Sequence, residues 1–164
     1  MKTIYLIRHA KSSWSSLSLN DFDRPLNERG KKDAPFIGKK LKELRFNPDE
    51  IRSSPSKRTT KTIKLICKEV DFDFKNVVFK KELFHPSLTI FKSEINSLSD
   101  TINSVAFVSH NFGISDFGNY LTDNAIGVMP TCGVVKINID IDTWQELIEG
   151  LGTLEYYVYP KMKT

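Results

Sequence analysis

The segment TIYLIRH, residues 3–9, contains the pattern that decides the fold. Its first five residues are all aliphatic, aromatic or β-branched, and an arginine and a histidine follow them directly. Such a run is typical of a strand that is buried on both faces, as in the parallel sheets of α/β proteins. Similar runs occupy residues 76–79 and 104–108, with a weaker one at 49–53. We therefore predict that these segments form the centre of one sheet.

Amphipathic helices are predicted between these runs. Apolar residues recur at steps of three and four along two segments, namely Ala34, Ile37, Leu41 and Leu44, and Leu88, Phe91, Ile95 and Leu98. Pro35 does not fit deep inside a helix, so either the first helix begins near Asp33 or a separate turn at residues 27–30 precedes it. Ser54 and Pro55 have the residue types of an N-cap and a first helical position, which predicts the start of a third helix.

The end of the chain has a different pattern. Apolar residues alternate with polar ones along residues 135–142, which predicts a strand with one solvent-exposed face. Residues 154–159 are the next candidate, close enough in sequence to pair with that strand in antiparallel fashion. Strands that alternate with helices indicate an α/β three-layer sandwich, with a mostly parallel central sheet, helices on both faces and an antiparallel edge.

The amino-acid composition limits the classes of protein to which the chain can belong. With 164 residues, of which 40% are hydrophobic, the chain suits a single domain, residues 1–164, with a sizeable core. The net charge of +4 favours an anionic substrate, and because the basic residues are spread along the chain we expect no nucleic-acid partner. No signal-peptide pattern follows Met1 and no apolar stretch approaches a membrane span, so we expect a cytoplasmic protein that does not bind membranes. Cys67 and Cys132 lack metal-site spacing and are predicted to be free thiols.

Unusual polar residues follow the predicted strands. Arg8 and His9 follow the first, Arg58 lies in the first turn of the helix after the second, Glu82 follows the third and His110 the fourth. Ligands of parallel sheets bind beyond the carboxyl ends of the strands, arginine binds phosphate oxygens through its rigid fork, and helix N-termini attract anions. Taken singly, these residues also fit a surface histidine, a solvated helix arginine and a histidine packed at a turn. Their convergence favours an anion site.

Three other residues bear on this interpretation. His85, which precedes Pro86, is interpreted as a structural or surface histidine. Asp21 and Asp23 have the side chains of metal ligands, but no second cluster converges on them in the sequence. We therefore predict no metal site.

Several motifs, taken in order, resemble those of the histidine phosphatase superfamily, also called the phosphoglycerate-mutase-like family. RHAKS at residues 8–12 looks like its arginine–histidine motif, SSPSKRTTKT at 53–62 like its S-S-P-x-x-R-x-x-x-T helix start, and SHN at 109–111 like its second-histidine motif. DRPLNERG at 23–30 and MPT at 129–131 narrow the resemblance to the short SixA-type phosphohistidine phosphatases. The matching segments cover most of the chain.

The resemblance implies a phosphoglycerate-mutase-like fold and phosphoryl transfer through a covalent phosphohistidine. By match to the motifs, His9 would be the nucleophile, while Arg8, Arg58 and His110 would bind the phosphoryl oxygens. Secondary substrate contacts would come from Ser12, Ser15 and Arg24. Phosphoryl transfer needs alignment and positive charge on the equatorial oxygens, which two arginines and an imidazole supply, so no metal and no other cofactor is expected.

Departures from the family pattern bear on the substrate. Members that act on alcohol phosphates carry an acidic proton donor on a longer segment after the third strand, and Glu82 is the only candidate for that donor here. In addition, SHNFG at 109–113 replaces the G-H-N-P-G of short members. An alkoxide needs that proton because its conjugate acid has a pKa near that of water, about 15.7, whereas imidazole, with a pKa of about 6.5, leaves readily. The short chain also leaves no room for a long insert over the site.

Three functions remain open from the sequence. The leading one is a phosphatase that hydrolyses phosphohistidine on a phosphorylated protein. The second is a phosphomonoesterase for a small phosphorylated molecule, with Glu82 as proton donor. The third is a phosphate-binding module without catalysis, which would have no need of His9 as a nucleophile.

Overall fold

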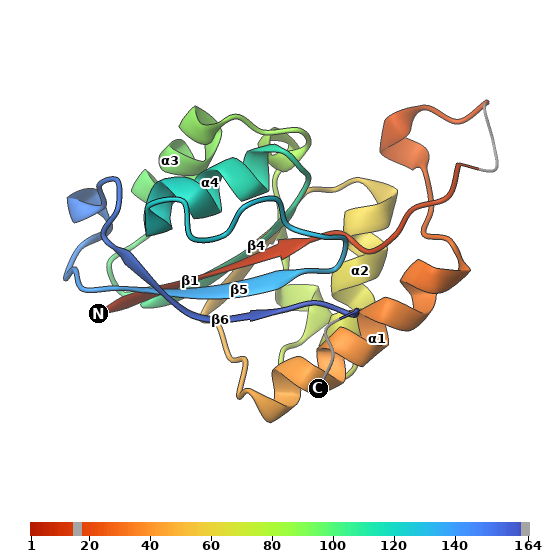
Figure 1. Ribbon diagram of the computed structural model, residues 1–164, viewed down its shortest axis with the longest axis horizontal. Coiled ribbons are helices and arrows are strands. Elements are labelled where there is room, and N and C mark those ends of the chain that lie inside the picture. Colours follow the sequence, from red (N-terminus) through yellow and green to blue (C-terminus); the bar gives the residue numbers. More distant parts are fainter. Residues whose placement is uncertain (15–17, 162–164) are drawn as a thin grey trace.

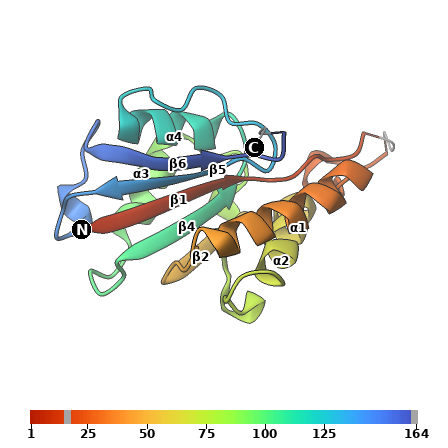
Figure 2. The ribbon, with the colours of Figure 1, turned by 60° about the horizontal axis from the view of Figure 1, so that its bottom comes forward.

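A six-stranded sheet runs through the part of the chain that the computed structural model describes, residues 1–14 and 18–161 (Figures 1 and 2). Its strands are β1 (Lys2–Arg8), β2 (Glu50–Ser53), β3 (Val78–Phe79), β4 (Ser104–Ser109), β5 (Val134–Ile139) and β6 (Gly152–Val158). Their order across the sheet is β3-β2-β4-β1-β5-β6. The first four are parallel, whereas β5 is antiparallel to β1 and β6 to β5. The predicted parallel centre and antiparallel edge are confirmed.

Helices cover both faces of this sheet, which gives three layers (Figure 1). The helices are α1 (Glu28–Glu43) and α2 (Lys57–Cys67) on one face, and α3 (Leu88–Asn96) and α4 (Gly113–Thr122) on the other. Short 3-10 helices are η1 (Asp21–Asp23), η2 (Phe74–Asn76), η3 (Lys81–Leu83) and η4 (Trp144–Glu146). None of the helices in the described ranges is long and apolar enough to cross a membrane.

The apolar run of β1 is explained by two hydrophobic cores. Tyr5 and Ile7 belong to the core beneath α1 and α2, while Ile4 and Leu6 belong to the core beneath α3 and α4. Successive side chains of a strand point to opposite faces, so a strand between two cores is apolar at every position. The TIYLI pattern therefore indicates the central strand of a three-layer fold.

Strand β3 differs from its prediction. The run at residues 76–79 predicts a strand buried on both faces, but β3 has two residues and lies at the edge of the sheet. Val78 and Phe79 are 36% and 39% exposed, and of the apolar residues in this run only Val77 is buried. The composition of a short run does not say whether the strand has a neighbour on one side or on both.

Helix α1 begins earlier than the sequence indicates. Asn27 is the N-cap, with its side chain accepting a hydrogen bond from the backbone N–H of Gly30 at 2.8 Å, and the helix continues through Pro35. A start near Asp33 is therefore wrong, as is a separate turn before the helix. Pro35 removes the N–H that would bond to the carbonyl of Lys31. Lys31 is exposed, so water can donate to that carbonyl instead.

The N-cap of α2 is Ser56 rather than Ser54. Ser56 Oγ accepts a hydrogen bond from the backbone N–H of Thr59 at 3.3 Å, so Pro55 precedes the helix. Ser54 Oγ instead contacts His110 Nε2 at 2.9 Å. Both serines have the residue type that N-caps prefer. Both also approach His110 Nε2, Ser56 Oγ at 3.5 Å, and Ser54 Oγ accepts from the backbone N–H of Ser56 at 3.3 Å, so residue type alone does not say which serine caps the helix.

A buried ion pair joins β2 to α3. Arg52 Nη1 donates to Glu94 Oε1 at 2.9 Å, and Arg52 Nε donates to Glu50 Oε2 at 2.6 Å. Arg52 and Glu94 are each 7% exposed. Because β2 ends at Ser53, this pair anchors the strand that leads to Ser54 and α2.

Replacing Glu94 by alanine is expected to lower the free energy of unfolding by about 3 kcal/mol, because the buried guanidinium keeps only Glu50 as an anionic partner. The matched control is Glu155→Ala, which removes a carboxylate 2.8 Å from Lys136 Nζ whose side chain is 45% exposed. Loss of that exposed pair should cost at most about 1 kcal/mol. Urea denaturation measures both changes, and equal losses would contradict the structural role given to Glu94.

Candidate active site

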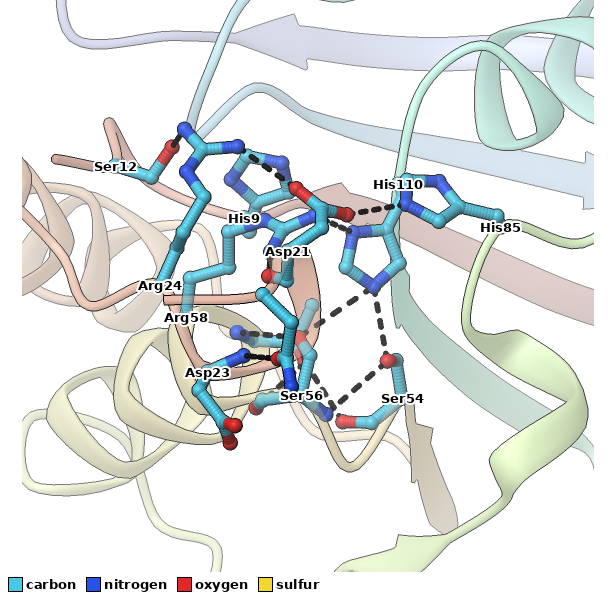
Figure 3. A network of polar contacts seen from close by, with 12 residues as sticks. His9, Ser12, Asp21, Asp23, Arg24, Ser54, Ser56, Arg58, His85 and His110 are labelled. Atoms are coloured by element: carbon cyan, nitrogen blue, oxygen red, sulfur yellow. Dashed lines mark hydrogen bonds and ion pairs between the residues drawn. The ribbon is translucent and has the colours of Figure 1, made fainter. Parts of the chain in front are cut away.

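Two histidines meet at the carboxyl edge of the parallel strands. β1 ends at Arg8 and β4 at Ser109, and these residues are partners in the β1–β4 register. His9 and His110 are the next residue after each strand, and their ring centroids lie 5.3 Å apart (Figure 3). The separation of the two imidazoles thus follows from the pairing of two central strands. The ends of β1 and β4 therefore converge, as the sequence predicts.

The two histidines line a cavity of about 460 Å³. Its cationic side chains are Arg8, Lys11, Arg24 and Arg58, and the other lining residues are Ser12, Trp14, Asp21, His85, Asn111, Phe112 and Thr131. Among the described residues that line this cavity, Asp21 is the only carboxylate. Four cationic side chains against one anion give the cavity a positive excess, which favours an anionic ligand.

His9 is held as a neutral imidazole with one nitrogen free. Its Nδ1 lies 2.7 Å from the backbone oxygen of Ala10, which can only accept, so Nδ1 carries the proton and Nε2 keeps its lone pair. Burial, and after it the charges of Arg58 and Arg8, lower the pKa of His9 to about 3, although the Ala10 hydrogen bond opposes this in part. At pH 7 the Nε2 atom is therefore unprotonated and chemically a nucleophile.

Arg58 and His110 form a second buried contact. Arg58 Nη2 donates to His110 Nδ1 at 3.1 Å, so the proton of this imidazole lies on Nε2, which donates to Ser54 Oγ at 2.9 Å. Burial lowers the pKa of His110 to about 2, and the neighbouring His9 and Arg58 add to this effect. The guanidinium of Arg58 comes from the first turn of α2, as the sequence predicts.

One carboxylate holds the cationic side chains together. Asp21 Oδ1 accepts from Arg24 Nη1 at 2.8 Å, while Oδ2 lies 3.0 Å from Arg58 Nη2 and 2.6 Å from His85 Nε2 (Figure 3). Arg58 Nη1 also donates to the backbone oxygen of Asp21. Burial raises the pKa of Asp21, but the hydrogen bonds from His85, Arg24 and Arg58 outweigh it and hold the pKa well below its usual range. Asp21 is therefore an ionised bridge across the cavity.

Ser12 and Arg24 lie together beside this bridge. Arg24 Nη2 donates to Ser12 Oγ at 2.5 Å, and the Arg24 guanidinium carbon lies 3.2 Å from the centroid of the Trp14 ring. Both predicted secondary contacts thus line the cavity. The third, Ser15, lies outside the described residues.

Arg8 has a donor without a partner. Its Nη1 donates to the backbone oxygen of Met129 at 2.8 Å, whereas its Nε is buried and unpartnered, as is the Nε of Arg58. Burial, and then the charge of Arg58, lowers the pKa of Arg8. A buried donor left unpaired costs about 1–3 kcal/mol. Both arginines line the cavity, so an anion bound there would meet two guanidinium groups.

His85 joins the site, and Glu82 does not. His85 is half exposed, as predicted for a surface histidine, but it also lines the cavity, with its ring centroid 4.9 Å from that of His110. Glu82 lies in η3, is exposed and is not among the cavity-lining residues. The sequence holds no periodic signal for His85. The single hint is its position shortly after the third strand.

Asp21 is likewise a site residue that the sequence interpretation missed. Its partners are two arginines and a histidine, in place of the metal ion considered for it. In the described ranges no group of three or more His, Cys, Asp or Glu side chains is arranged to hold a metal ion. The signal that points to Asp21 is its position three residues before Arg24, with which it pairs.

Comparisons with known proteins agree with this geometry. The model of the histidine phosphatase superfamily (branch 1) matches residues 4–83. An uncharacterised chloroplastic protein of Arabidopsis thaliana is 30% identical over 153 residues, which cover 88% of this chain and 70% of that protein.

Two solved structures have the same fold over nearly their whole length. The SixA protein of Agrobacterium tumefaciens superposes with a TM-score of 0.81 at 24% identity, covering 97% of this chain and 98% of that one. The protein histidine phosphatase SixA complexed with tungstate superposes with a TM-score of 0.82 at 17% identity, covering 96% and 97%. The chain thus belongs to the histidine phosphatase superfamily and is a phosphatase with the fold of the SixA proteins.

Proposed function

We propose that this phosphatase hydrolyses phosphohistidine on a protein, through a covalent phosphohistidine at His9. The observation that carries the proposal is the state of His9: it is neutral, its Nδ1 is fixed by the Ala10 carbonyl, and it borders a cavity of cationic side chains. A neutral imidazole in a positive cavity attacks an anionic phosphorus centre without needing a separate base to activate it.

The reaction proceeds in two displacements. The Nε2 lone pair of His9 forms a bond to phosphorus, and the P–N bond of the substrate breaks, with its electron pair going to the substrate imidazole, which takes up a proton from water at its other ring nitrogen and leaves as the neutral base. Water then attacks the phosphorus of phospho-His9 and loses a proton to the solvent, and the P–Nε2 bond breaks with its electron pair returning to His9, which releases phosphate and the free histidine. In both steps Arg8 and Arg58 bind the equatorial oxygens, where the charge of the transition state is spread. The sequence motifs assign the same role to His110, but its single N–H donates to Ser54 and its Nδ1 accepts from Arg58, so we propose that it orients Arg58.

The position of Glu82 favours a phosphoramidate substrate over an alcohol phosphate. Glu82 is exposed and outside the cavity, so no carboxylic acid among the described cavity residues is placed to protonate an alkoxide, and Asp21 is held ionised. An imidazole leaving group does not require a strong proton donor, because its pKa is about 6.5. The cavity therefore suits cleavage of an N–P bond.

The mouth of the cavity suits a protein substrate. Trp14 and Phe112 both line it and are 69% and 67% exposed. Large apolar side chains exposed beside a polar cavity are typical of protein contact surfaces. A histidine that projects from a protein surface would enter the cavity while its surroundings contact these rings.

Replacing His9 by asparagine is expected to reduce phosphate release from a phosphohistidine protein by roughly 10³-fold or more, because the attacking nitrogen is lost. With a ³²P-labelled substrate, wild type should also trap an acid-labile, base-stable label that the variant does not. Circular dichroism checks that the variant is folded. Undiminished turnover in His9→Asn would contradict the mechanism.

Replacing Glu82 by glutamine should change kcat/KM for the phosphohistidine protein by less than about 2-fold, since general acids whose loss matters contribute roughly 10²-fold or more. The same variant is assayed on a panel of sugar phosphates. A clear preference of wild type for a sugar phosphate that is lost in Glu82→Gln would instead support the small-molecule phosphomonoesterase.

The pKa values of the two buried histidines give a prediction about pH. Their folded-state pKa values of about 3 and about 2 lie below the reference value of about 6.5, so between pH 7.5 and 5 neither imidazole should take up a proton. NMR of the imidazole ¹⁵N resonances measures this, with the free amino acid as the reference that does titrate. Protonation of His9 near pH 6.5 would contradict the neutral-nucleophile mechanism.

A further inference from the structure

A second hollow adjoins the active-site cavity and is larger, about 590 Å³. Apolar side chains, among them Phe22 and Pro25, line part of it, together with lysines at its border. Phe22 is 38% exposed and its ring lies 5.2 Å from that of Phe84, which itself lies 5.2 Å from His110. The hollow is thus connected to the active site through two aromatic rings.

The border of this hollow is strongly basic. Lys57, Lys61 and Lys64 succeed one another at helical spacing along α2, and Lys31 faces them from α1. Asp23 is the only carboxylate among the described residues that line the hollow. Lys31 has a partner in Glu28 at 3.3 Å, but that glutamate is 88% exposed, so solvent screens the pair.

A row of lysines on a helix is ordinarily a solvated face. Here the row borders a hollow that also has Phe22, Pro25 and Leu26 in its lining, so charged and apolar side chains face the same space. The apolar part favours contact with a segment that has apolar side chains, and the lysines favour acidic ones.

The 3-10 helix η1 forms the wall between the two spaces. Asp21 lines the active-site cavity, whereas Phe22 and Asp23 line the hollow. Figure 3 shows Asp21 between Arg24 and His85, with Asp23 apart from both histidines His85 and His110. A polypeptide that places one residue in the cavity therefore has this hollow directly beside it, on the other side of η1.

We propose that the hollow binds an acidic, amphipathic segment of the phosphoprotein substrate, next to the phosphorylated residue. Acidic side chains of that segment pair with Lys57, Lys61 and Lys64, and its apolar side chains cover Phe22. This inference rests on the proposed action on a phosphorylated protein. It adds which surface of the enzyme recognises that protein substrate.

The test compares two phosphohistidine peptides, one with aspartate and glutamate around the phosphohistidine and one with serine and glutamine there, and a small phosphoramidate. Wild type should hydrolyse the acidic peptide with a KM roughly 10-fold lower than the neutral one, and this advantage should fall as salt is raised. The double variant Lys61→Glu, Lys64→Glu should lose the advantage through KM, with kcat unchanged, because neither lysine lines the active-site cavity. Its hydrolysis of the phosphoramidate should stay within about 2-fold of wild type.

The matched control is Lys32→Glu, Lys39→Glu, which changes the net charge equally at two exposed positions of α1 that do not line the hollow. It should keep at least about half of the wild-type preference for the acidic peptide. Equal KM values of wild type for the two peptides, or equal losses in both double variants, would overturn the docking proposal alone. Absence of hydrolysis of both peptides by wild type would overturn the proposed function, and the docking proposal with it.

Discussion

The ionised carboxylate of Asp21 is the interaction on which the arrangement of the site depends. It contacts Arg24, Arg58 and His85, which come from three separate parts of the chain. Without an anion among them, two guanidinium groups would face each other in a buried place, where like charges repel far more strongly than in water. Asp21 offsets part of that charge and leaves an excess. The same carboxylate thus assembles the site and keeps it receptive to anions.

Hydroxyl groups on α2 and just before it explain why the motif around Arg58 has small polar residues at fixed positions. Ser54 accepts a hydrogen bond from His110, and Ser56 caps the helix. Thr62 Oγ1 donates to the backbone oxygen of Arg58 at 2.7 Å and accepts from the N–H of Ala10 at 3.0 Å, so it fixes the chain directly after His9. Ser54 thus connects the start of α2 to the end of β4, and Thr62 connects α2 to the chain after β1, so the two hydroxyls hold His110 and His9 in a fixed relation to Arg58.

The central sheet and the convergence of strand ends could be predicted from the sequence. A strand that is buried on both faces has apolar residues at successive positions, and that pattern is visible in the strand's own sequence. The run before Arg8 is the clearest case. Other features depend on contacts between distant parts of the chain. His85 enters the site by pairing with Asp21, 64 residues earlier, and Ser54 contacts His110, 56 residues later. Such contacts leave no pattern in the local sequence. The periodicity of apolar residues and the rules for helix caps therefore could not identify His85 and Asp21 as residues of the site.

The position of His9 and His110 directly after central strands also affects when the two imidazoles separate during unfolding. The N–H of His9 donates to the Ser109 oxygen at 3.2 Å, and the His9 oxygen accepts from Cys132 at 2.9 Å. The backbone of His9 is therefore continuous with the hydrogen bonding of the sheet core. Regions of this kind open only at a free energy close to that of global unfolding, whereas peripheral elements such as η1 can open separately. We therefore expect the pair of imidazoles to stay in place until the sheet itself unfolds.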